Sequence, residues 1–229
     1  MENFLQELYR LQDGRRDPVG LTALSRKLGV SPAAVAQMSV RLSGEGWIQR
    51  RGRQGISLAP KGRANALLLI RRHRLAERFF TDLLGLSLEQ AHIEAHRFEH
   101  VISDEVDRRL DALLHHPERC PCGHPIPTEN GKIQSDADLM PLDALPPGRN
   151  AEIVRLSEDD SRILRYLETL RLLPGVRVTV LERAPFGGPL TLQAGAGKRS
   201  IGAEVASRIF VRPAPNPRGP RARVPPVPR

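Results

Sequence analysis

The chain has 229 residues, 40% of them hydrophobic, and a formal net charge of +9, which is enough for one or two domains with a buried core. It holds no run close to the roughly 18 apolar residues that span a bilayer, and its first residues lack the pattern of a signal peptide, so we expect neither a membrane protein nor a secreted one. The two cysteines, Cys120 and Cys122, are too close together to staple a fold, which favours a reducing cytoplasm.

Residues 1–64 predict a winged helix-turn-helix DNA-binding domain. Leucines at helical spacing predict a first helix over residues 2–12. Two further amphipathic segments are separated by GVSP, in which Gly29 ends one helix, Ser31 caps the next and Pro32 occupies its first position. Helix, tight turn and helix form the helix-turn-helix pattern. The following segment, GEGWIQRRGRQGISLAP, alternates around a basic turn and predicts a two-stranded wing.

Residues 65–130 predict a helical domain. PKGRANALLLIRRHRLAERFFTDLLG has helical periodicity for about six turns and stops at Gly85. Helix resumes over residues 87–115, with an interruption near Ser103. The loop ERCPCGHPIP then ends the helical part of the chain.

The remaining residues predict a second, smaller domain between two unstructured segments. Residues 131–150 are rich in Asp, Pro and Gly and are expected to be a linker. Residues 151–212 contain four or five short strands and one helix, which predicts a small β-barrel. Residues 213–229 are rich in proline and arginine and are expected to be a disordered basic tail. The fold class is therefore mainly α with a small carboxyl-terminal β-barrel.

Charge is distributed unevenly along the chain. Residues 1–75 hold 14 Lys and Arg against 5 Asp and Glu, whereas residues 76–140 hold 6 against 13. A basic amino-terminal block suits DNA, because phosphate contacts supply most non-specific affinity. The acidic middle would be repelled by DNA and suits cations. This contrast favours a protein that binds DNA with one part and metal with another.

The segment AHIEAHRFEH predicts a metal site. Residues three and four apart share one face of a helix, and here that face carries His92, His96, Glu99 and His100. Glu94 points the other way. One helix earlier, His73 and Glu77 form another i,i+4 pair. Imidazole and carboxylate donors together suit Mn(II), Fe(II), Co(II), Ni(II) or Zn(II).

The nearby CPCGH segment has the wrong spacing for a zinc knuckle and lacks a second cysteine pair, which favours a rigid loop with reduced thiols. For the histidines and glutamates, two interpretations other than a metal sensor stay open. The histidines could serve a metal-dependent hydrolase, but no HExxH pattern occurs and Glu94 faces away. The metal could also be purely structural in a DNA-binding regulator. Titrating DNA affinity against metal separates co-repression from a structural role.

HRLAERF, EAHRFEHVISDEV and the G-x-P-I-P of CPCGHPIP occur in this order, and together they resemble the diphtheria toxin repressor family. The resemblance covers about residues 2–212. It implies iron- or manganese-dependent transcriptional regulators, which are not enzymes, with a winged helix, a helical metal-binding and dimerisation domain and a small β-barrel. It implies a first metal site of His73, Glu77 and His92, with Asp160 as the best candidate for an added ligand. It implies a second, regulatory site of Asn3, His96, Glu99 and His100.

The sequence departs from this family at two of these positions. The family usually carries Met or Asp where this chain has Asn3, and Cys or Glu where it has His96. Cysteine accompanies the iron-type members and glutamate the manganese-type members. Histidine removes a soft thiolate, which disfavours sulfur-preferring ions. Mn(II) or Fe(II) is the expected ion, with Zn(II), Co(II) or Ni(II) as substitutes in vitro.

The resemblance also implies a DNA surface and a mechanism. The second helix of the helix-turn-helix would enter the major groove, and arginines would hold phosphates. The expected DNA-binding residues are Ser31, Ala33, Ala34, Gln37, Arg41, Arg51 and Arg53. Metal would act as co-repressor by ordering a homodimer for a palindromic operator upstream of metal-homeostasis genes. We expect no membrane partner and no small-molecule substrate.

Overall fold

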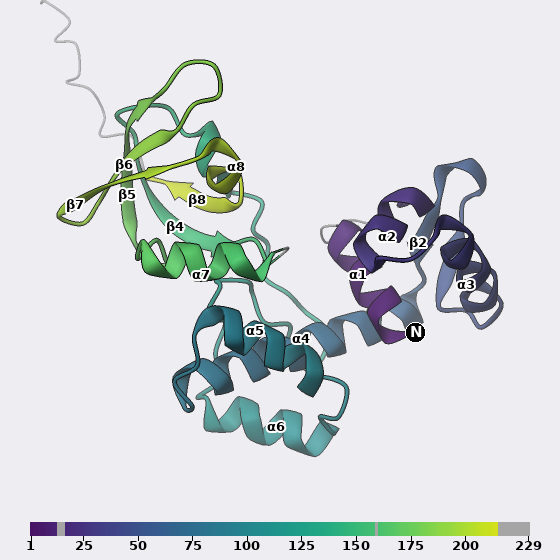
Figure 1. Ribbon diagram of the computed structural model, residues 1–229. Coiled ribbons are helices and arrows are strands. Elements are labelled where there is room, and N and C mark those ends of the chain that lie inside the picture. The colour runs from purple at the N-terminus through teal and green to yellow at the C-terminus, as the bar shows by residue number, and fades with distance from the viewer. Residues whose placement is uncertain (13–16, 159, 215–229) are drawn as a thin grey trace, which may run out of the picture. The chain divides into compact units, whose positions relative to one another are not determined.

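The computed structural model describes residues 1–12, 17–158 and 160–214. The chain divides into two compact units, Met1–Ser135 and Asp136–Arg229, which are described separately. Figure 1 shows the helices of the first unit and the sheet of the second. In the described residues, no helix is long and apolar enough to cross a membrane.

The first unit begins with a winged helix-turn-helix, as predicted. Its elements are α1 (Glu2–Gln12), α2 (Leu21–Leu28), α3 (Pro32–Gly44), β1 (Ile48–Arg50), η1 (Gly52–Gln54) and β2 (Ile56–Leu58). Gly29 ends α2 in a left-handed conformation, with φ +66°. The Ser31 hydroxyl accepts a hydrogen bond from the Ala34 N–H and caps α3, and Pro32 follows at the first helical position. The antiparallel pair β1 and β2 forms the wing, with η1 at its tip.

The apolar faces of these helices meet in one core. Leu5 and Leu8 of α1, Leu24 of α2 and Leu42 of α3 are all 0% exposed. Burying a leucine stabilises a fold by about 1.5–3 kcal/mol, so this core holds the three helices together. Gly62, near the start of the next helix, permits close packing, because a Cβ there would lie 2.0 Å from the Trp47 carbonyl oxygen.

Three further helices complete the first unit: α4 (Pro60–Asp82), α5 (Leu88–Phe98) and α6 (Asp104–Leu113). Ser87 and Gln90 form a reciprocal capping box at the start of α5. Ser103 caps α6 by accepting a hydrogen bond from the Val106 N–H, which confirms the interruption expected there. Ala76, Ala95 and Ile102 form a small core where these helices meet. Because Ala76 and Ala95 are small, the backbones of α4 and α5 lie close together. Polar side chains of the two helices can therefore contact one another.

The second unit is a six-stranded antiparallel sheet with two short helices. Its elements are β3 (Met140–Pro141), η2 (Leu142–Ala144), β4 (Asn150–Leu156), α7 (Ser161–Thr169), β5 (Arg177–Arg183), β6 (Leu190–Ala194), β7 (Gly197–Ile201), α8 (Ala203–Ala206) and β8 (Ile209–Pro213). The strand order is β3-β8-β4-β5-β6-β7. This confirms the small carboxyl-terminal β domain expected from the sequence, but its sheet is open rather than closed into a barrel, because no pairing among the described residues joins the outer strands β3 and β7. Two-residue β3 includes Pro141, which has no N–H to donate to a further strand.

The segment expected to be a linker, residues 131–150, contributes to this second unit. Met140 and Pro141 pair with Val211 and Phe210 of β8. Leu142 is fully buried nearby. These apolar residues are scattered among Pro and Asp, so they give no strand periodicity in the sequence. The expected basic tail falls on residues 213–229, and 215–229 lie outside the described residues.

Candidate metal centre

Packing of α4 on α5 brings His73, Glu77 and His92 together in the interior. Glu77 Oε1 lies 3.1 Å from His73 Nε2 and 2.8 Å from His92 Nδ1. His73 Nε2 lies 3.3 Å from His92 Nδ1. The three side chains are almost completely buried. Two imidazoles from different helices therefore share one carboxylate oxygen.

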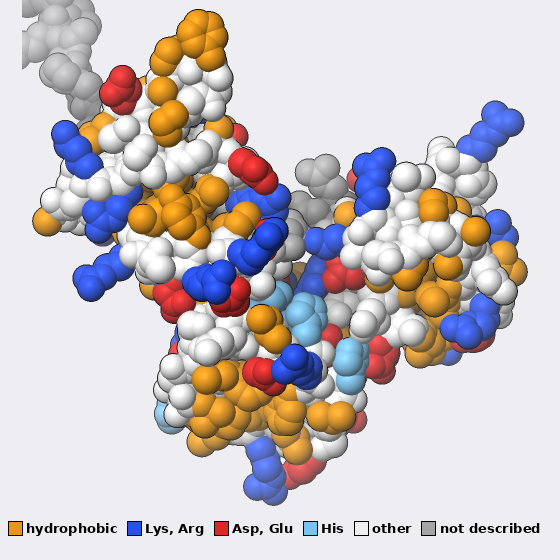
Figure 2. Space-filling view, in the orientation of Figure 1, with side chains coloured by type: hydrophobic (Ala, Val, Ile, Leu, Met, Phe, Trp, Pro, Cys, Tyr) orange, Lys and Arg blue, Asp and Glu red, His pale blue; other side chains and the backbone are white. Residues whose placement is uncertain are grey.

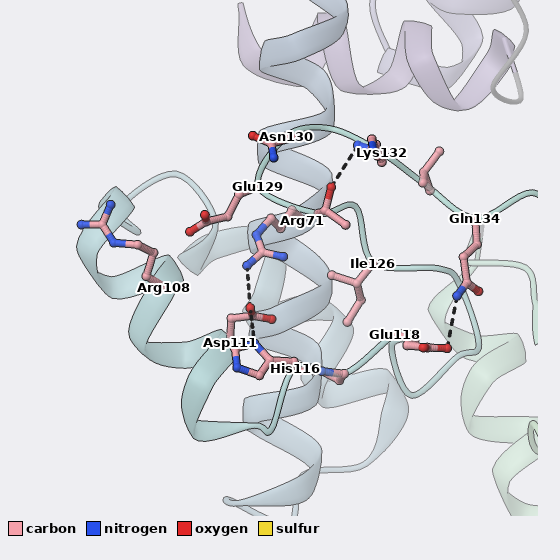
Figure 3. Close-up of a pocket in the computed structure, with 13 residues that line it drawn as sticks. Arg71, Arg108, Asp111, His116, Glu118, Ile126, Glu129, Asn130, Lys132 and Gln134 are labelled. Atoms are coloured by element: carbon pink, nitrogen blue, oxygen red, sulfur yellow. Dashed lines mark hydrogen bonds and ion pairs between the residues drawn. The ribbon is translucent and has the colours of Figure 1, made fainter.

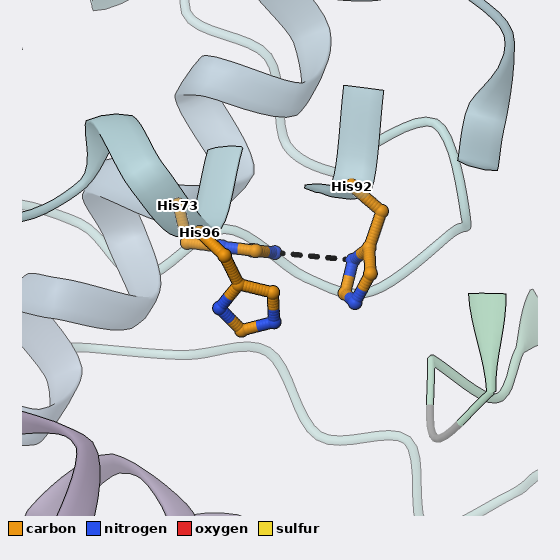
Figure 4. A group of neighbouring side chains, drawn as sticks. All are labelled: His73, His92 and His96. Atoms are coloured by element: carbon orange, nitrogen blue, oxygen red, sulfur yellow. Dashed lines mark hydrogen bonds between the residues drawn. The ribbon is translucent and has the colours of Figure 1, made fainter. Parts of the chain in front are cut away.

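His96, one turn after His92 on α5, lies beside the same group (Figure 4). Its ring centre is 4.5 Å from that of His73 and 4.7 Å from that of His92. One ligand nitrogen from each of the three histidines lies within 4.8 Å of the others. His96 is the most accessible of the three, with 40% of its side chain exposed.

Glu99 connects this histidine group to α1. Its Oε2 lies 2.8 Å from His73 Nδ1 and accepts a hydrogen bond of 3.2 Å from Gln6 Nε2. Its Oε1 lies 3.7 Å from His96 Nδ1 and 3.5 Å from His100 Nε2. Glu99 is fully buried. One carboxylate thus touches residues of both metal sites that the family resemblance implies.

The first helix meets this region through Glu2 and Gln6. Glu2 Oε2 lies 2.7 Å from His100 Nδ1. Asn3 is exposed, and the hydrogen bonds and ion pairs found for the described residues include none from Asn3 to the histidine group. The sequence did not indicate Glu2 and Gln6, because single polar residues in an amphipathic helix carry no distinguishing signal, even where one of them, Gln6, is buried in the structure.

The charges of this cluster are strongly coupled. Burial would lower the pKa of His73, but the carboxylates of Glu77 and Glu99 raise it to about 9. Burial would raise the pKa of Glu77, yet His73 and His92 hold it well below its ordinary value. Burial likewise opposes ionisation of Glu99, but the neighbouring imidazoles of His73 and His96 lower its pKa to about 2. Burial lowers the pKa of His96. Both carboxylates are therefore ionised and stabilised by positive charge.

The residues of this cluster fit a divalent transition metal. Glu77 Oε2 and Glu99 Oε1 are buried oxygens with no hydrogen-bond partner. A buried acceptor left unsatisfied costs about 1–3 kcal/mol, and more when it is charged. Imidazole nitrogens and carboxylate oxygens are the donors that Mn(II), Fe(II) and Zn(II) accept. A cation among these side chains would remove the penalty.

Asp160 belongs to the second unit and has a local role there. It caps α7 by accepting a hydrogen bond from the Arg162 N–H, and its carboxylate lies 2.7 Å from Arg162 Nη2. Hydrogen bonds from Arg162 lower the pKa of Asp160 to about 2. Its assignment as a metal ligand stays a prediction.

The CPCGH segment forms a tight loop. The Cys120 N–H donates to the His124 carbonyl, and the Gly123 N–H donates to the Cys120 carbonyl. Cys120 and Cys122 are buried and form no disulfide with each other. Cys120 Sγ lies within 4.8 Å of a Glu77 carboxylate oxygen, so the loop brings a soft donor beside the metal-ligand candidates.

The expected DNA-contacting residues lie on the surface of the winged helix-turn-helix. All seven are exposed: Ser31, Ala33, Ala34, Gln37, Arg41, Arg51 and Arg53. The first five lie at or along α3, and the last two lie at the wing. Arg51 Nη2 donates to Gln49 Oε1, and Arg41 lies 3.9 Å from Glu45. These exposed pairs are weak enough for phosphates to replace them.

A polar pocket lies between α6 and the loop that follows it (Figure 3). Several of its charged side chains pair with one another. Asp111 lies 3.1 Å from Arg71 and 2.8 Å from His116, and Gln134 donates to Glu118. The pair of His116 with Asp111 links the loop to α6, the pair of Arg71 with Asp111 links α4 to α6, and the pair of Gln134 with Glu118 links two parts of the loop.

An apolar surface covers the end of α4 and the region of α5 and α6. Figure 2 shows hydrophobic side chains gathered over these helices. The exposed members, which we call the α4–α6 apolar surface, are Leu83, Leu84, Ile93, Val101, Val106 and Leu113. Exposed apolar residues that gather on one part of a surface mark interaction sites.

Three family models match consecutive parts of the chain. The iron dependent repressor N-terminal DNA binding domain matches residues 1–56. The iron dependent repressor metal binding and dimerisation domain matches residues 59–128. The FeoA domain matches residues 140–213.

The similar proteins and solved structures are also metal-dependent repressors. The iron-dependent repressor IdeR of Mycobacterium leprae is 33% identical over 221 residues, covering 92% of this chain and 95% of the relative. The diphtheria toxin repressor of Corynebacterium glutamicum is 37% identical over 164 residues, covering 69% of this chain and 71% of the relative. A manganese-dependent transcriptional repressor in complex with manganese has a TM-score of 0.85 at 29% identity, covering 93% of this chain and 99% of that structure. ScaR with bound Cd²⁺ has a TM-score of 0.77 at 29% identity, covering 92% and 97%.

Proposed function

Because the chain belongs to the diphtheria toxin repressor family, we propose that the His and Glu cluster described above is its metal sensor and that α1 carries the signal to the DNA-binding helices. The protein is a metal-dependent, DNA-binding transcriptional repressor that responds to Mn(II) or Fe(II), and it is not an enzyme. We propose which residues hold the metal and how metal binding changes the affinity of the protein for DNA.

Two groups of side chains would hold metal. The first is His73, Glu77 and His92, which the structure brings within hydrogen-bonding distance of one another. The second includes Glu99 and His100, with Glu2 and Gln6 of α1 beside them. His96 lies next to both groups. Metal ligation by Asn3 and Asp160 stays a prediction from the family resemblance.

The contacts of α1 with Glu99 and His100 are the observation that carries this proposal. Gln6 binds Glu99, and Glu2 binds His100, while Leu5 and Leu8 on the same helix are buried in the DNA-binding core. A bound metal supplies positive charge that fixes Glu99 and His100 in place. These two residues would then fix α1 and, through the core, α2 and α3. When α1 is already held in its DNA-binding position, DNA binding no longer includes the free-energy cost of ordering this helix.

The protein forms a homodimer, and we infer that the α4–α6 apolar surface is the dimer interface. Two recognition helices related by a two-fold axis match a palindromic operator, with half-sites about one helical turn apart. Holding α1 against Glu99 and His100 would set the spacing of these helices. Metal-uptake genes are the expected targets.

Removing metal is expected to weaken operator binding at least about tenfold, which is within the 1–3 kcal/mol typical of coupling between two sites. The measurement is fluorescence anisotropy of operator DNA under anaerobic conditions with chelator, Mn(II), Fe(II) or Zn(II). Scrambled DNA serves as the control. Equal operator affinity with chelator and with every metal would reject co-repression and favour a purely structural metal.

Replacing Arg53 by alanine is expected to weaken DNA binding a few-fold and to reduce the salt slope of log K by about 0.9, because one phosphate contact is lost. The loss should be equal for operator and scrambled DNA, since phosphate contacts carry no sequence information. Arg97→Ala is the matched control, because Arg97 is an exposed arginine paired with Glu94 on α5. An Arg53 variant with an unchanged salt slope would remove the wing from the DNA interface.

A further inference from the structure

His96 lies closer to His73 and His92 than an assignment to the second site implies. The three ring nitrogens fall within 4.8 Å of one another. Two nitrogens bound to one ion by bonds of about 2.0–2.1 Å lie at most about 4.2 Å apart, so side-chain movements of less than about 1 Å would bring the three within reach of a single ion. The rings of His73 and His96 are tilted by 54°, and those of His92 and His96 by 80°. Figure 4 shows His73 facing His92, with the imidazole of His96 beside this pair.

We propose that His96 joins His73, His92 and Glu77 in one three-histidine, one-carboxylate metal site. Glu77 Oε1 already touches both His73 and His92, and its Oε2 is buried without a hydrogen-bond partner. Glu77 would thus be the carboxylate donor beside the three imidazoles, through its contacts with His73 and His92. This inference rests on the proposed function, because it assigns ligands to a metal that the repressor senses.

Glu99 holds His73 in the orientation that such a site requires. The His73 Nδ1 lies 2.8 Å from Glu99 Oε2, which leaves His73 Nε2 on the side of Glu77 and His92. A carboxylate that accepts the second N–H of a ligating histidine fixes the tautomer and makes the other nitrogen a better ligand. Glu99 is therefore a positioning residue for this site, while its Oε1 remains directed toward His96 and His100.

The donor set changes the expected metal preference. Three imidazoles and one carboxylate suit borderline ions such as Fe(II), Co(II) and Zn(II), whereas Mn(II) favours sites with more oxygen donors. A glutamate at position 96 would give two imidazoles and two carboxylates. His96→Glu should therefore shift the preference of this site toward Mn(II), and His96→Ala should weaken it for every ion.

Cobalt binding to the full-length protein tests the assignment without DNA. Co(II) is titrated into wild type and into His96→Ala, His92→Ala, His100→Ala and the His92→Ala/His96→Ala double variant, and visible absorption reports the ligand field. We expect His96→Ala to weaken the same binding event as His92→Ala, at least about tenfold, because even the loss of an outer partner costs 10–100-fold. The double variant should weaken this same event further and leave the event sensitive to His100→Ala unchanged, since both residues serve one ion.

The opposite pattern would overturn the proposal. If His96→Ala leaves the event lost in His92→Ala unchanged and weakens the event sensitive to His100→Ala, His96 belongs to the second site. Circular dichroism of each apo variant shows whether it folds, and His96→Glu provides a ligand-bearing replacement. A near-ultraviolet sulfur-to-cobalt band would place Cys120 at this ion and overturn the proposed donor set. Failure of co-repression would instead show as intact Co(II) binding with metal-independent operator affinity.

Discussion

Replacing Glu99 by glutamine is expected to raise the Mn(II) concentration needed for half-maximal operator binding about 100-fold, at the upper end of the effect of residues around a metal ligand. Glu99 is fully buried and lies at the junction of three parts: His73 of the first site, His96 and His100, and Gln6 of α1. Glutamine keeps the size of the side chain but removes its charge.

The expected loss has two causes. The amide lacks the negative charge that attracts the ion and that stabilises His73, whose pKa the two carboxylates Glu77 and Glu99 raise to about 9. The amide also presents an NH₂ group on one side. In the position of Oε2 this group would face His73 Nδ1 and the Gln6 NH₂ group, and in the position of Oε1 it would replace the oxygen directed toward His96 and His100. Because both sites depend on Glu99, its replacement should cost more than that of His96.

The measurement is anisotropy of operator DNA as a function of free Mn(II), with isothermal titration of Mn(II) into the protein alone. Glu94→Gln is the matched control, because Glu94 lies on the same helix but is exposed and pairs with Arg97. It should leave the activation midpoint unchanged. Equal midpoints for Glu99→Gln and Glu94→Gln would show that Glu99 neither binds nor positions the metal.

Local sequence signals predicted the helices and their ends. Ser31 and Pro32 mark the start of α3, and Ser103 marks the start of α6, because capping depends only on residues within one turn. The histidine stripe was equally visible, since helical spacing alone places His92 and His96 on one face. These features need no knowledge of the tertiary fold.

Long-range contacts could not be predicted in the same way. Gln6 and Glu99 are 93 positions apart, and no local pattern reveals that a glutamine on α1 meets that carboxylate. The sequence also points to Asn3, whereas Glu2 is the residue that reaches His100. One helical position changes the direction of a side chain by about 100°, so neighbouring residues of α1 face different partners, and metal ligation by Asn3 stays a prediction. Whether the sheet of the second unit closes into a barrel could not be predicted for the same reason. Closure depends on long-range pairing of the outermost strands, which no local pattern reveals.

Replacing Asp107 by alanine is expected to lower the free energy of unfolding by about 3 kcal/mol, the low end for breaking one partner out of a buried ion pair. Arg71 on α4 is 95% buried at its side chain, with Nε 2.8 Å from Asp107 and Nη2 3.1 Å from Asp111 on α6. It also donates to the Pro127 carbonyl. One arginine thus joins α4, α6 and the loop beyond them, part of which Figure 3 shows.

Without Asp107, Arg71 would keep Asp111 as its partner but leave its Nε buried without an acceptor. Unfolding by heat, followed by far-ultraviolet circular dichroism on the metal-free protein, should show a midpoint about 10 °C lower. Glu105→Ala is the matched control, because Glu105 lies on the same turn of α6 and pairs with two exposed arginines, so its loss should leave the midpoint unchanged. If both variants unfold at the wild-type midpoint, Asp111 alone neutralises Arg71, and Asp111→Ala should then show the larger loss. Since the metal-ligand candidates lie on α4 and α5, the same variant separates stability from sensing: the fully folded fraction should retain its Mn(II) affinity.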